Sequence, residues 1–199
     1  MRKKFSLIIF TDLDGSLLHR DNFKFDEIKE YIKSLIDEGI IIIPNTSKTE
    51  KEIEEFIKEL GLNLPFISEN GSSIHGLDLI NSNFPNKIIL SRDKQEIIKI
   101  FSSKVSEELK AKCKFISEMN TKEQIDILGL QDKNLKNALN RKYTIPFLFK
   151  GNKVEKNKLF KVLRSASLTM QEGGRVLNLG DNIDKVKSMN KVLKIYKKI

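Results

Sequence analysis

The sequence predicts an α/β protein in which a doubly wound parallel sheet is followed by a second, α+β domain. Three observations support this prediction. Short apolar runs alternate with amphipathic helical stretches in the first third of the 199 residues, the joints between them are tight, and the pattern changes near residue 84. Strands connected through helices pair in parallel, so the first part is expected to carry helices on both faces of its sheet.

Local signals place the first elements. Residues 5–10 form a short apolar run, and Asp26 is placed to cap an amphipathic helix that ends at Gly39. The consecutive isoleucines at 40–43 have the composition of a fully buried strand, which Pro44 stops. The chain is therefore expected to open with a strand, a helix and a second strand.

A second helix and a third strand follow. Thr49 and Glu52 have the spacing of a capping box, and the helix that they open is expected to reach Leu60 and end at Gly61. Residues 65–68 are expected to form the third strand, which completes the pattern of a parallel sheet.

The rest of the chain is expected to form an inserted domain and a returning helix. The expected strands are 87–90, 114–117, 145–150, 168–170 and 175–179, and the expected helices are 93–110, 121–128, 132–141 and 154–165. A lysine-rich helix over 184–199 then returns to the first part. We therefore expect a core made of residues 1–83 and 180–199 and an inserted α+β domain made of residues 84–179.

The first apolar run ends in the motif D-x-D-G-S at residues 12–16, which suits phosphoryl transfer to an aspartate. Asp12 can attack phosphorus, and Asp14 can pass a proton to and from the leaving oxygen. The two like charges repel each other, and a hard cation such as Mg²⁺ relieves that repulsion, so the motif implies a metal bound by Asp12 and Asp14. For these residues alone, an ordinary Asp-Gly turn after a strand is an equally open interpretation.

Two further polar clusters, at residues 45–48 and 69–71, directly follow expected strands. Ligands of parallel sheets bind at the carboxyl ends of the strands, so we expect both clusters to converge with Asp12. Three polar clusters at one edge of the sheet indicate an active site.

Hydroxyl and ammonium groups in these clusters can hold a phosphoryl group. Thr46 and Ser47 can donate hydrogen bonds to phosphoryl oxygens, and Lys48 adds a positive charge. Lys185, at the start of the last expected helix, can neutralise negative charge that develops on the phosphoryl group. Taken singly, Thr46 also fits a helix-capping loop and Lys185 a solvated surface; only the joint pattern favours catalysis.

Composition and charge limit the kind of partner. The formal net charge is +9, but the lysines are interspersed with glutamates, as at residues 50–59, and no basic stripe with interleaved aromatic residues is present. No apolar stretch approaches the roughly 20 residues of a membrane span, and Cys113, the only cysteine, excludes an intrachain disulfide. We therefore expect a cytoplasmic protein with an anionic substrate and with neither nucleic acid nor a membrane as its partner.

The two histidines, His19 and His75, lack the spacing of a zinc site. His75 follows the E-N-G stretch and is placed to touch a substrate, but the expected position is a loop that faces solvent.

Five stretches occur in a recognisable order: F-T-D-L-D-G-S at 10–16, P-N-T-S-K-T at 44–49, I-S-E-N-G-S-S-I at 67–74, R-K-Y-T-I-P-F at 141–147 and G-G-R-V-L at 173–177. Together they resemble the haloacid dehalogenase-like phosphatases and, among these, the mannosyl-3-phosphoglycerate phosphatases. The first stretch is typical of the whole superfamily, whereas the other four indicate the narrower family.

The resemblance implies a Rossmann-like core with a cap domain, dependence on Mg²⁺ and a phosphoaspartyl intermediate. In this family pattern Asp12 is the nucleophile and a metal ligand, and Asp14 is the general acid and base, with its backbone carbonyl also expected to bind the metal. The residues expected to bind phosphate are Thr46, Ser47 and Lys185, and those expected to bind the rest of the substrate are Lys48, Glu69, Asn70, Arg141 and Arg175. Arginines recognise carboxylates and phosphates bidentately, although a salt bridge at the surface or between the domains is an alternative for Arg141 and Arg175.

The sequence also departs from the family. Asn178 and Val186 stand where family members usually carry histidine and glycine. The acidic fourth motif that completes the metal site is expected after the last helix, and residues 180–184, G-D-N-I-D, match it only locally and too early. Because the chain ends at Ile199, we expect a C-terminally truncated core whose first strand has an exposed edge through which copies can associate.

The leading hypothesis is a Mg²⁺-dependent phosphatase that converts mannosyl-3-phosphoglycerate, or its glucosyl analogue, to the glycosylglycerate, a compatible solute. The alternatives are a broader sugar-phosphate phosphatase of the same superfamily and a truncated, inactive module that binds sugar phosphates. A basic nucleic-acid binder is a more distant alternative.

Overall fold

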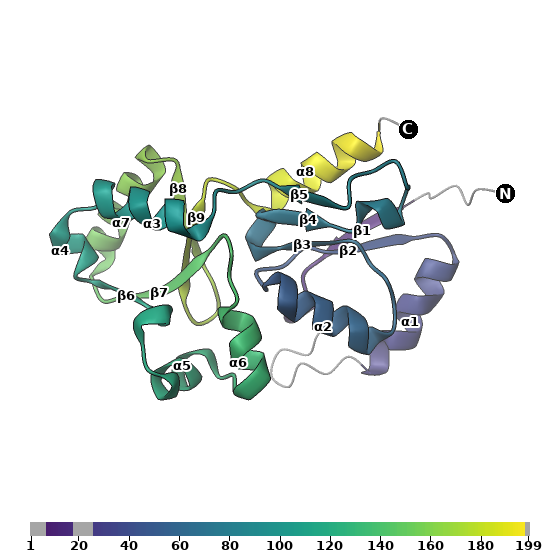
Figure 1. The fold of residues 1–199 in the computed structure, drawn as a ribbon, viewed down its shortest axis with the longest axis horizontal. Coiled ribbons are helices and arrows are strands. Elements are labelled where there is room, and N and C mark those ends of the chain that lie inside the picture. The colour runs from purple at the N-terminus through teal and green to yellow at the C-terminus, as the bar shows by residue number, and fades with distance from the viewer. Residues whose placement is uncertain (1–6, 18–25, 198–199) are drawn as a thin grey trace. The chain divides into compact units, whose positions relative to one another are not determined.

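The computed structural model describes residues 7–17 and 26–197, which divide into two compact units (Figure 1). The core unit comprises residues 1–90 and 184–199, and the inserted unit comprises residues 91–183. His19, residues 5 and 6 of the expected first strand and the side chain of Asp26 lie outside the described residues.

The core unit contains both ends of the chain. Its elements are β1 (Ile8–Thr11), α1 (Asp26–Asp37), β2 (Ile41–Pro44), α2 (Glu50–Leu60), β3 (Phe66–Ser68), the 3₁₀ turns η1 (Glu69–Gly71) and η2 (Leu77–Leu79), β4 (Ser73–His75), β5 (Lys87–Ile89) and α8 (Lys185–Tyr196).

The strands of the core unit are parallel at its start and antiparallel later. β1 pairs in parallel with β2, and a single parallel bridge between Asn45 and Ile67 leads on to β3. β3, β4 and β5 then pair in antiparallel order. The α/β class is confirmed, and the sheet pairing is mixed because β4, only three residues long, folds back after a tight turn that apolar patterning does not reveal.

Alternate isoleucines of β2 face opposite sides of the sheet, as the period of a strand requires. Ile42 packs in one apolar cluster with Ile32 of α1 and Ile53 of α2, whereas Ile43 packs in another with Val192 of α8. Helices α1 and α2 therefore cover one face and α8 the other, which explains why a short run of isoleucines can be wholly apolar (Figure 1).

The capping box predicted at the start of α2 is confirmed. Thr49 Oγ1 accepts a hydrogen bond from the Glu52 N–H, and a carboxylate oxygen of Glu52 accepts one from the Thr49 N–H. Such a cap stabilises a helix by about 1 kcal/mol. Gly61 ends α2 in the left-handed conformation, at φ 70°. The cap also fixes the point at which the loop between β2 and α2 enters the helix.

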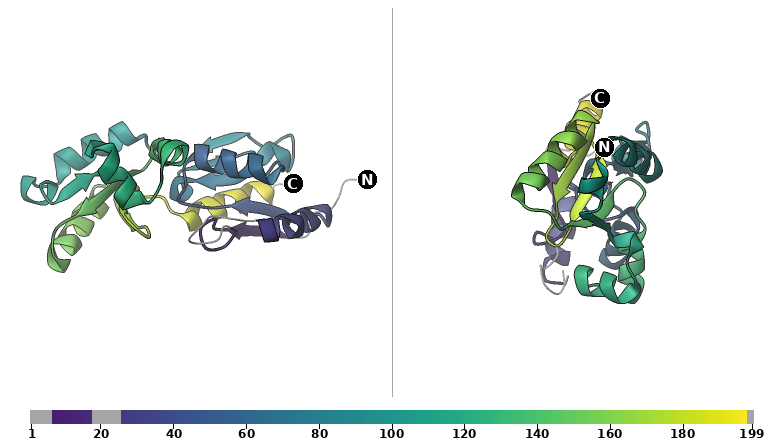
Figure 2. Two further views of the ribbon diagram at one scale, coloured as in Figure 1. Left: turned by 90° about the horizontal axis from the view of Figure 1, so that it is seen from below. Right: turned by 90° about the vertical axis from the view of Figure 1, so that its left-hand side faces the viewer.

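The inserted unit is an antiparallel sheet packed against helices. Its elements are α3 (Lys94–Lys104), α4 (Glu107–Lys110), β6 (Cys113–Phe115), the 3₁₀ turn η3 (Ile116–Glu118), α5 (Thr121–Leu128), α6 (Asp132–Leu139), β7 (Ile145–Phe149), α7 (Lys153–Ser165), β8 (Leu168–Glu172) and β9 (Leu177–Asp181). The strand order is β6-β7-β9-β8. Its apolar core includes Phe101 of α3, Phe147 of β7 and Leu159 of α7. Figure 2 shows the ribbon from two further sides.

The single helix expected over 93–110 is wrong. The chain leaves the helix at Val105, which is extended and buried in the apolar core, and Ser106 starts the short helix α4. Val105 is β-branched, so its helix propensity is low, and burying its side chain outweighs two more turns of helix.

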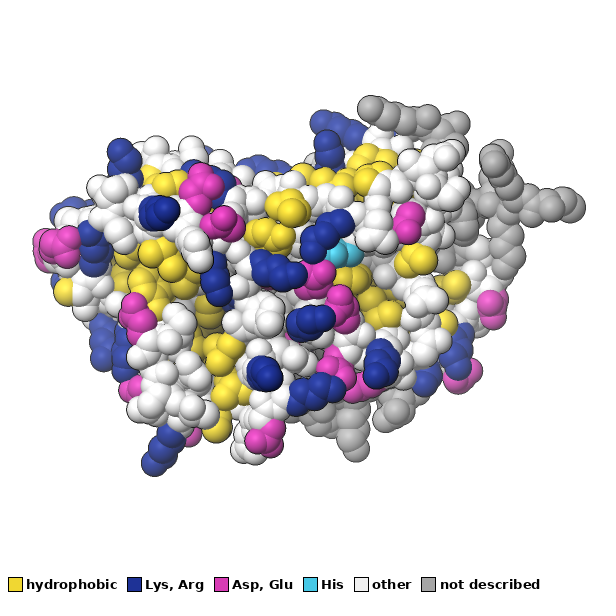
Figure 3. Space-filling view, in the orientation of Figure 1, with side chains coloured by type: hydrophobic (Ala, Val, Ile, Leu, Met, Phe, Trp, Pro, Cys, Tyr) yellow, Lys and Arg dark blue, Asp and Glu magenta, His cyan; other side chains and the backbone are white. Residues whose placement is uncertain are grey.

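Charged side chains are interspersed on the face shown in Figure 3, where lysines and arginines lie among aspartates and glutamates. Among the helices that the structure describes, none is both long and apolar enough to cross a membrane.

Candidate active site

The D-x-D motif forms a turn at the carboxyl end of β1. Leu13 is wholly buried, and the aspartates on either side of it have side chains that are 42% (Asp12) and 41% (Asp14) exposed. The Leu13 N–H donates to Asp12 Oδ1 over 2.8 Å, and Gly15 adopts φ 72°, a conformation that favours glycine. The turn is therefore anchored by its apolar residue while both carboxylates remain accessible.

Each of these carboxylates faces a lysine. Lys185 Nζ lies 2.6 Å from Asp12 Oδ2, although the two residues are 173 positions apart in sequence. Lys48 Nζ lies 3.0 Å from Asp14 Oδ1 and 3.7 Å from Glu52 Oε1. The site thus places two ammonium groups beside two aspartates. An anionic phosphoryl group can replace a carboxylate as the binding partner of either lysine.

The loop after β2 is tied to its neighbours by hydrogen bonds. The Asn45 N–H donates to the Thr11 carbonyl over 2.7 Å, and the Thr46 N–H donates to the Ile67 carbonyl over 3.1 Å. Thr46 is wholly buried, and its Oγ1 accepts from the Lys48 N–H, whereas Ser47 is half-buried. These bonds bring the carboxyl ends of β1, β2 and β3 together, as the predicted site requires.

The E-N-G stretch forms the turn η1 that holds this loop from the other side. The Glu69 N–H donates to the Lys48 carbonyl and the Asn70 N–H to the Thr46 carbonyl, each over 2.9 Å. Both donors adopt positive φ, 46° for Glu69 and 59° for Asn70, and both are buried. The turn therefore shapes the loop that contains Thr46 and Lys48, and direct contact of Glu69 or Asn70 with a substrate stays a prediction.

Gly71 allows the start of α8 to approach this turn. A Cβ atom at Gly71, where φ is 101°, would lie 2.4 Å from the Asp184 carbonyl oxygen. The wholly buried Ser188 donates to the Lys185 carbonyl over 2.9 Å, and Asn45 Nδ2 donates to the same carbonyl over 3.0 Å. Lys185 is thus positioned by a close backbone approach and by two polar side chains.

Sequence reasoning gave no role to Asn45 or Ser188. Asn45 lies inside a polar stretch that was recognised as a whole, and its buried Oδ1 has no hydrogen-bond partner among the described residues. Ser188 lies one turn after Asp184 in a lysine-rich helix, and no local sequence pattern distinguishes it from the other polar residues of that helix. Their hydrogen bonds to the Lys185 carbonyl show that both residues hold the backbone of Lys185.

The two arginines predicted to bind the substrate contact residues of the inserted unit. Arg141 Nη1 donates to Thr144 Oγ1 over 2.8 Å, and Arg175 Nη1 donates to the Leu128 carbonyl. Asn178 lies buried in β9, and its Oδ1 has no hydrogen-bond partner within the part of the chain that the structure describes. A role of Arg141 and Arg175 in binding a substrate stays a prediction.

Asp181, in the stretch that resembles the fourth motif, belongs to an ion pair of the inserted unit. Arg92 Nη2 lies 2.7 Å from Asp181 Oδ1, and Nε and the backbone N–H of Arg92 donate to Asp181 Oδ2. Burial raises the pKa of the Asp181 carboxyl, but the hydrogen bonds from Arg92 and from the Asn182 N–H outweigh it and hold the pKa below its ordinary value. Asp181 is thus an ionised partner of Arg92.

The donor chemistry of the D-x-D turn fits Mg²⁺. Asp12 and Asp14 offer accessible carboxylate oxygens on one turn, and Mg²⁺ is commonly bound by one or two carboxylates together with waters and substrate phosphates. Within residues 7–17 and 26–197, no cluster of three or more His, Cys, Asp or Glu side chains could hold a metal ion. Binding of Mg²⁺ by Asp12 and Asp14 stays a prediction.

His75 lies in a different place from the one expected. It belongs to β4, it is 6% exposed, and its ring stacks on Phe66 with 4.5 Å between the ring centroids. The expectation of a loop histidine facing solvent is wrong, because the turn at Glu69–Gly71 is followed directly by a strand of the sheet.

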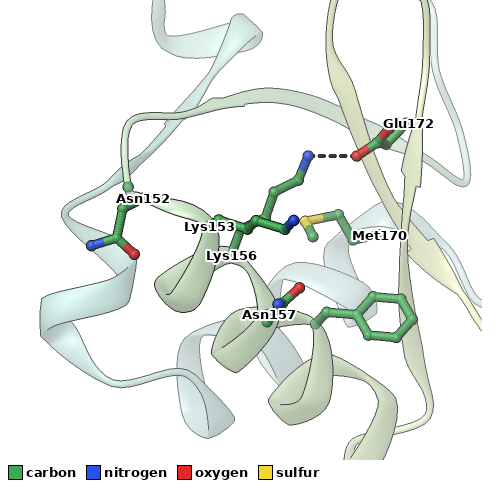
Figure 4. A pocket seen from close by; sticks show the side chains of 8 residues that line it. Asn152, Lys153, Lys156, Asn157, Met170 and Glu172 are labelled. Atoms are coloured by element: carbon green, nitrogen blue, oxygen red, sulfur yellow. Dashed lines mark hydrogen bonds and ion pairs between the residues drawn. The ribbon is translucent and has the colours of Figure 1, made fainter.

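A cavity of about 700 Å³ lies in the inserted unit, beside the start of α7 and the strand β8 (Figure 4). It is lined by Gly151, Asn152, Lys153, Lys156, Asn157, Phe160, Met170 and Glu172. Lys156 and Glu172 form an ion pair across it, and none of the predicted site residues lines it.

Comparison with known proteins shows the family of this chain. The family model of the haloacid dehalogenase-like hydrolases matches residues 9–198. The glucosyl-3-phosphoglycerate/mannosyl-3-phosphoglycerate phosphatase of Persephonella marina is 32% identical over 200 residues, which are 96% of this chain and 72% of that protein. The mannosyl-3-phosphoglycerate phosphatase of Pyrococcus horikoshii is 30% identical over 204 residues, which are 96% of this chain and 79% of that protein.

Solved structures show the same fold. A haloacid dehalogenase-like hydrolase from B. subtilis superposes with a TM-score of 0.67 at 18% identity, covering 96% of this chain and 79% of that one. The resemblance predicted from the five stretches of sequence is confirmed. The chain belongs to the haloacid dehalogenase-like hydrolase family, and it is a phosphatase of the phosphoric monoester hydrolase class.

Proposed function

We propose that this phosphatase hydrolyses mannosyl-3-phosphoglycerate or glucosyl-3-phosphoglycerate to the glycosylglycerate and inorganic phosphate. The observation that carries the proposal is the contact of 2.6 Å between Lys185 and Asp12, because it puts a cation beside the carboxylate that would attack phosphorus. The names of the relatives from Persephonella marina and Pyrococcus horikoshii support the choice of substrate.

In the first half of the proposed reaction, Asp12 attacks phosphorus and the bond to the glycerate oxygen breaks. Asp14, as the neutral acid, donates its proton to that oxygen, so that the sugar glycerate leaves as an alcohol. The product on the protein is an aspartyl phosphate at Asp12. Lys185 neutralises the phosphoryl oxygens while charge develops on them.

In the second half, Asp14 as carboxylate accepts a proton from water, and the water oxygen attacks the phosphorus of the aspartyl phosphate. The bond between phosphorus and Asp12 breaks, which releases phosphate and restores both aspartates. Lys48, which contacts Asp14 over 3.0 Å, keeps that carboxylate in place between the two proton transfers.

Mg²⁺ would be held by Asp12 and Asp14, and when bound it reduces the repulsion between the anionic nucleophile and the phosphate dianion. Thr46 and Ser47 belong to the loop that would surround the phosphoryl group, together with Lys48. We further propose that the inserted unit serves as the cap that recognises the sugar glycerate, with Arg141 and Arg175 as the groups for its carboxylate, and that the enzyme makes a compatible solute in the cytoplasm.

The test measures phosphate release from mannosyl-3-phosphoglycerate and glucosyl-3-phosphoglycerate by the purified chain, with Mg²⁺ and with EDTA. We expect Mg²⁺-dependent release that Asp12→Asn abolishes. Hexose 6-phosphates serve as the comparison substrates. Equal release from them would favour a broader sugar-phosphate phosphatase, and no release from any substrate by a folded chain would contradict the proposal.

A further inference from the structure

We propose that His75 is a positioning residue for the phosphoryl-binding loop, residues 45–49. It acts through a chain of side-chain contacts, here called the serine–histidine chain. Ser68, Ser73 and His75 are buried and joined by hydrogen bonds, and the partly exposed Glu50 lies within ion-pair distance of His75. The proposal deepens the proposed function, on which its catalytic consequence rests.

The serine–histidine chain is continuous. The Oγ atoms of Ser68 and Ser73 are 2.7 Å apart, and Ser73 Oγ lies 2.8 Å from His75 Nε2. On the other side of the ring, His75 Nδ1 lies 3.5 Å from Glu50 Oε1. Ser68 and Ser73 are wholly buried, so a hydroxyl of either serine that lost its neighbour would be left without water as a substitute.

The strand register builds this arrangement. In the antiparallel pair of β3 and β4, Ser68 lies opposite Ser73 and Phe66 lies opposite His75, so all four side chains share one face of the hairpin. The residues between them, Ile67 and Ile74, face the other side and pack with Val192 of α8. The polar chain is thus confined to the face on which α2 lies.

The two ends of the serine–histidine chain flank the phosphoryl-binding loop. Ser68 is followed directly by Glu69 and Asn70, whose N–H groups donate to the carbonyls of Lys48 and Thr46. Glu50, at the other end, is the first residue of α2 and directly follows the loop. A shift of the His75 side chain is therefore expected to displace the loop at both of its ends.

Lys87 fixes the outer end. Its Nζ lies 3.1 Å from both carboxylate oxygens of Glu50, and in the register of β4 and β5 Lys87 stands opposite His75. A ring with a proton on Nδ1 would present that proton to Glu50 Oε1, while Nε2 stays in hydrogen-bond contact with the Ser73 hydroxyl.

A serine beside a histidine and a glutamate also has the composition of a nucleophilic triad. Ser73 cannot serve as a nucleophile for a substrate, because its side chain is wholly buried between strands of the sheet. What the geometry supports is alignment of the loop that carries Thr46 and Lys48.

The test compares three variants at one hairpin. His75→Phe keeps the stacking on Phe66 and removes both ring nitrogens, whereas His75→Gln retains one amide group that can bond Ser73. Ile74→Val, on the same strand but on the opposite face, is the matched control for a change in a buried side chain.

Two measurements need no turnover. Hydrogen exchange of the Glu69 and Asn70 amides reports the bonds that hold the loop, and thermal-shift titration with inorganic phosphate reports the affinity of the site. We expect His75→Phe to speed exchange at these two amides about tenfold and to weaken phosphate binding about fivefold, in line with the loss of one or two buried hydrogen bonds. In His75→Gln, the exchange rates and the phosphate affinity should lie close to those of the wild type. In Ile74→Val, neither quantity should change by more than about twofold.

Steady-state kinetics supply the third measurement. A loop that is misplaced around the phosphoryl group should lower kcat more than it raises KM in His75→Phe. Ser73→Ala, which breaks the chain without adding volume, provides the same comparison if His75→Phe does not fold.

Wild-type exchange rates and phosphate affinity in His75→Phe and Ser73→Ala would overturn the proposal, as would equal changes in Ile74→Val. Absence of turnover in the wild type would count against the proposed function only, because exchange and phosphate binding still decide the role of His75.

Discussion

The two units each contain an aspartate at the end of a strand that meets a cation far away in sequence. In the core unit Asp12 pairs with Lys185 over 2.6 Å, and in the inserted unit Asp181 pairs with Arg92 over 2.7 Å. The shortest distances are nearly the same, but the surroundings of the two pairs differ.

The pair in the core unit is open and makes one contact. The Asp12 side chain is 42% exposed, against 16% for Asp181, and Lys185 contributes a single ammonium group. Arg92 binds Asp181 through its backbone N–H, Nε and Nη2, and Nη2 also donates to the Ser167 carbonyl. A planar guanidinium with several hydrogen bonds holds its carboxylate firmly, whereas a single contact from a partly exposed ammonium group is more easily exchanged for another anion.

The largest expected effect is on catalysis through Asp12. Asp12→Asn should lower phosphate release at least about 1,000-fold, because the amide cannot form the aspartyl phosphate. Its melting temperature should stay within about 3 °C of the wild type, since an exposed pair contributes little stability. Phosphate release and differential scanning calorimetry measure the two effects. A large fall in melting temperature would show that the Asp12–Lys185 pair stabilises the fold, as the Asp181–Arg92 pair is expected to do.

The next effect concerns the partner of Asp12. Lys185→Met should lower kcat/KM about 100-fold, the typical result of removing one group that stabilises developing charge. Lys191→Met, at an exposed position of the same helix, is the control and should leave kcat/KM within twofold. Unchanged kinetics in Lys185→Met would contradict the role of this ammonium group.

In the inserted unit the effect should fall on stability instead. Asp181→Asn should lower the free energy of unfolding by about 2 kcal/mol, because it leaves the bonds of the partly buried Arg92 without their anionic partner. Urea unfolding at pH 7 measures this change. The kcat of the folded fraction should stay within twofold, and a loss as large as that of Asp12→Asn would place Asp181 in the active site.

The contribution of the Asp181–Arg92 pair to stability should also depend on pH in the acid range. The folded-state pKa of Asp181 is lower than its unfolded-state value, so its contribution to stability is present above about pH 4 and is lost as the pH falls through the folded-state pKa. The difference in unfolding free energy between the wild type and Asp181→Asn should therefore be constant from pH 8 to about pH 5 and shrink below about pH 4. A difference that persists at pH 2 would show that the charge of Asp181 contributes nothing.

The smallest expected effect uses Cys113 of β6 as a reporter of the inserted unit. Burial raises the pKa of its thiol to about 11, so its reaction with a disulfide reagent at pH 8 should be slow. Asp181→Asn should speed this reaction by up to about tenfold, because local opening of the inserted unit becomes easier, and Asp12→Asn should not. Equal acceleration in both variants would show that the two units open together.

Much of the local structure was predictable because its causes are local. The capping box at Thr49, the left-handed Gly61 and the D-x-D turn after β1 depend on residues within a few positions of one another. Helix α5 likewise begins and ends at the predicted Thr121 and Leu128, where Asn120 caps it. Such signals survive in any fold that buries the neighbouring apolar residues.

Other features depended on contacts that the sequence does not encode locally. The helix ends at Val105 because its side chain packs in the apolar core, and His75 is buried because its ring stacks on Phe66. The pairing of Asp12 with Lys185 needs the close approach of α8 to Gly71, and the alignment of Lys185 needs Asn45.

By itself, therefore, the sequence determined the α/β class and the helix caps, and it singled out the carboxylates and lysines that the structure brings together. The tertiary structure alone decided which carboxylate meets which lysine, that Asp181 is bound to Arg92, and that buried Ser68, Ser73 and His75 lie next to the loop at residues 45–49. The physical reason is that caps and turns are stabilised by neighbours in sequence, whereas ion pairs and buried polar chains form only after the strands and helices have packed.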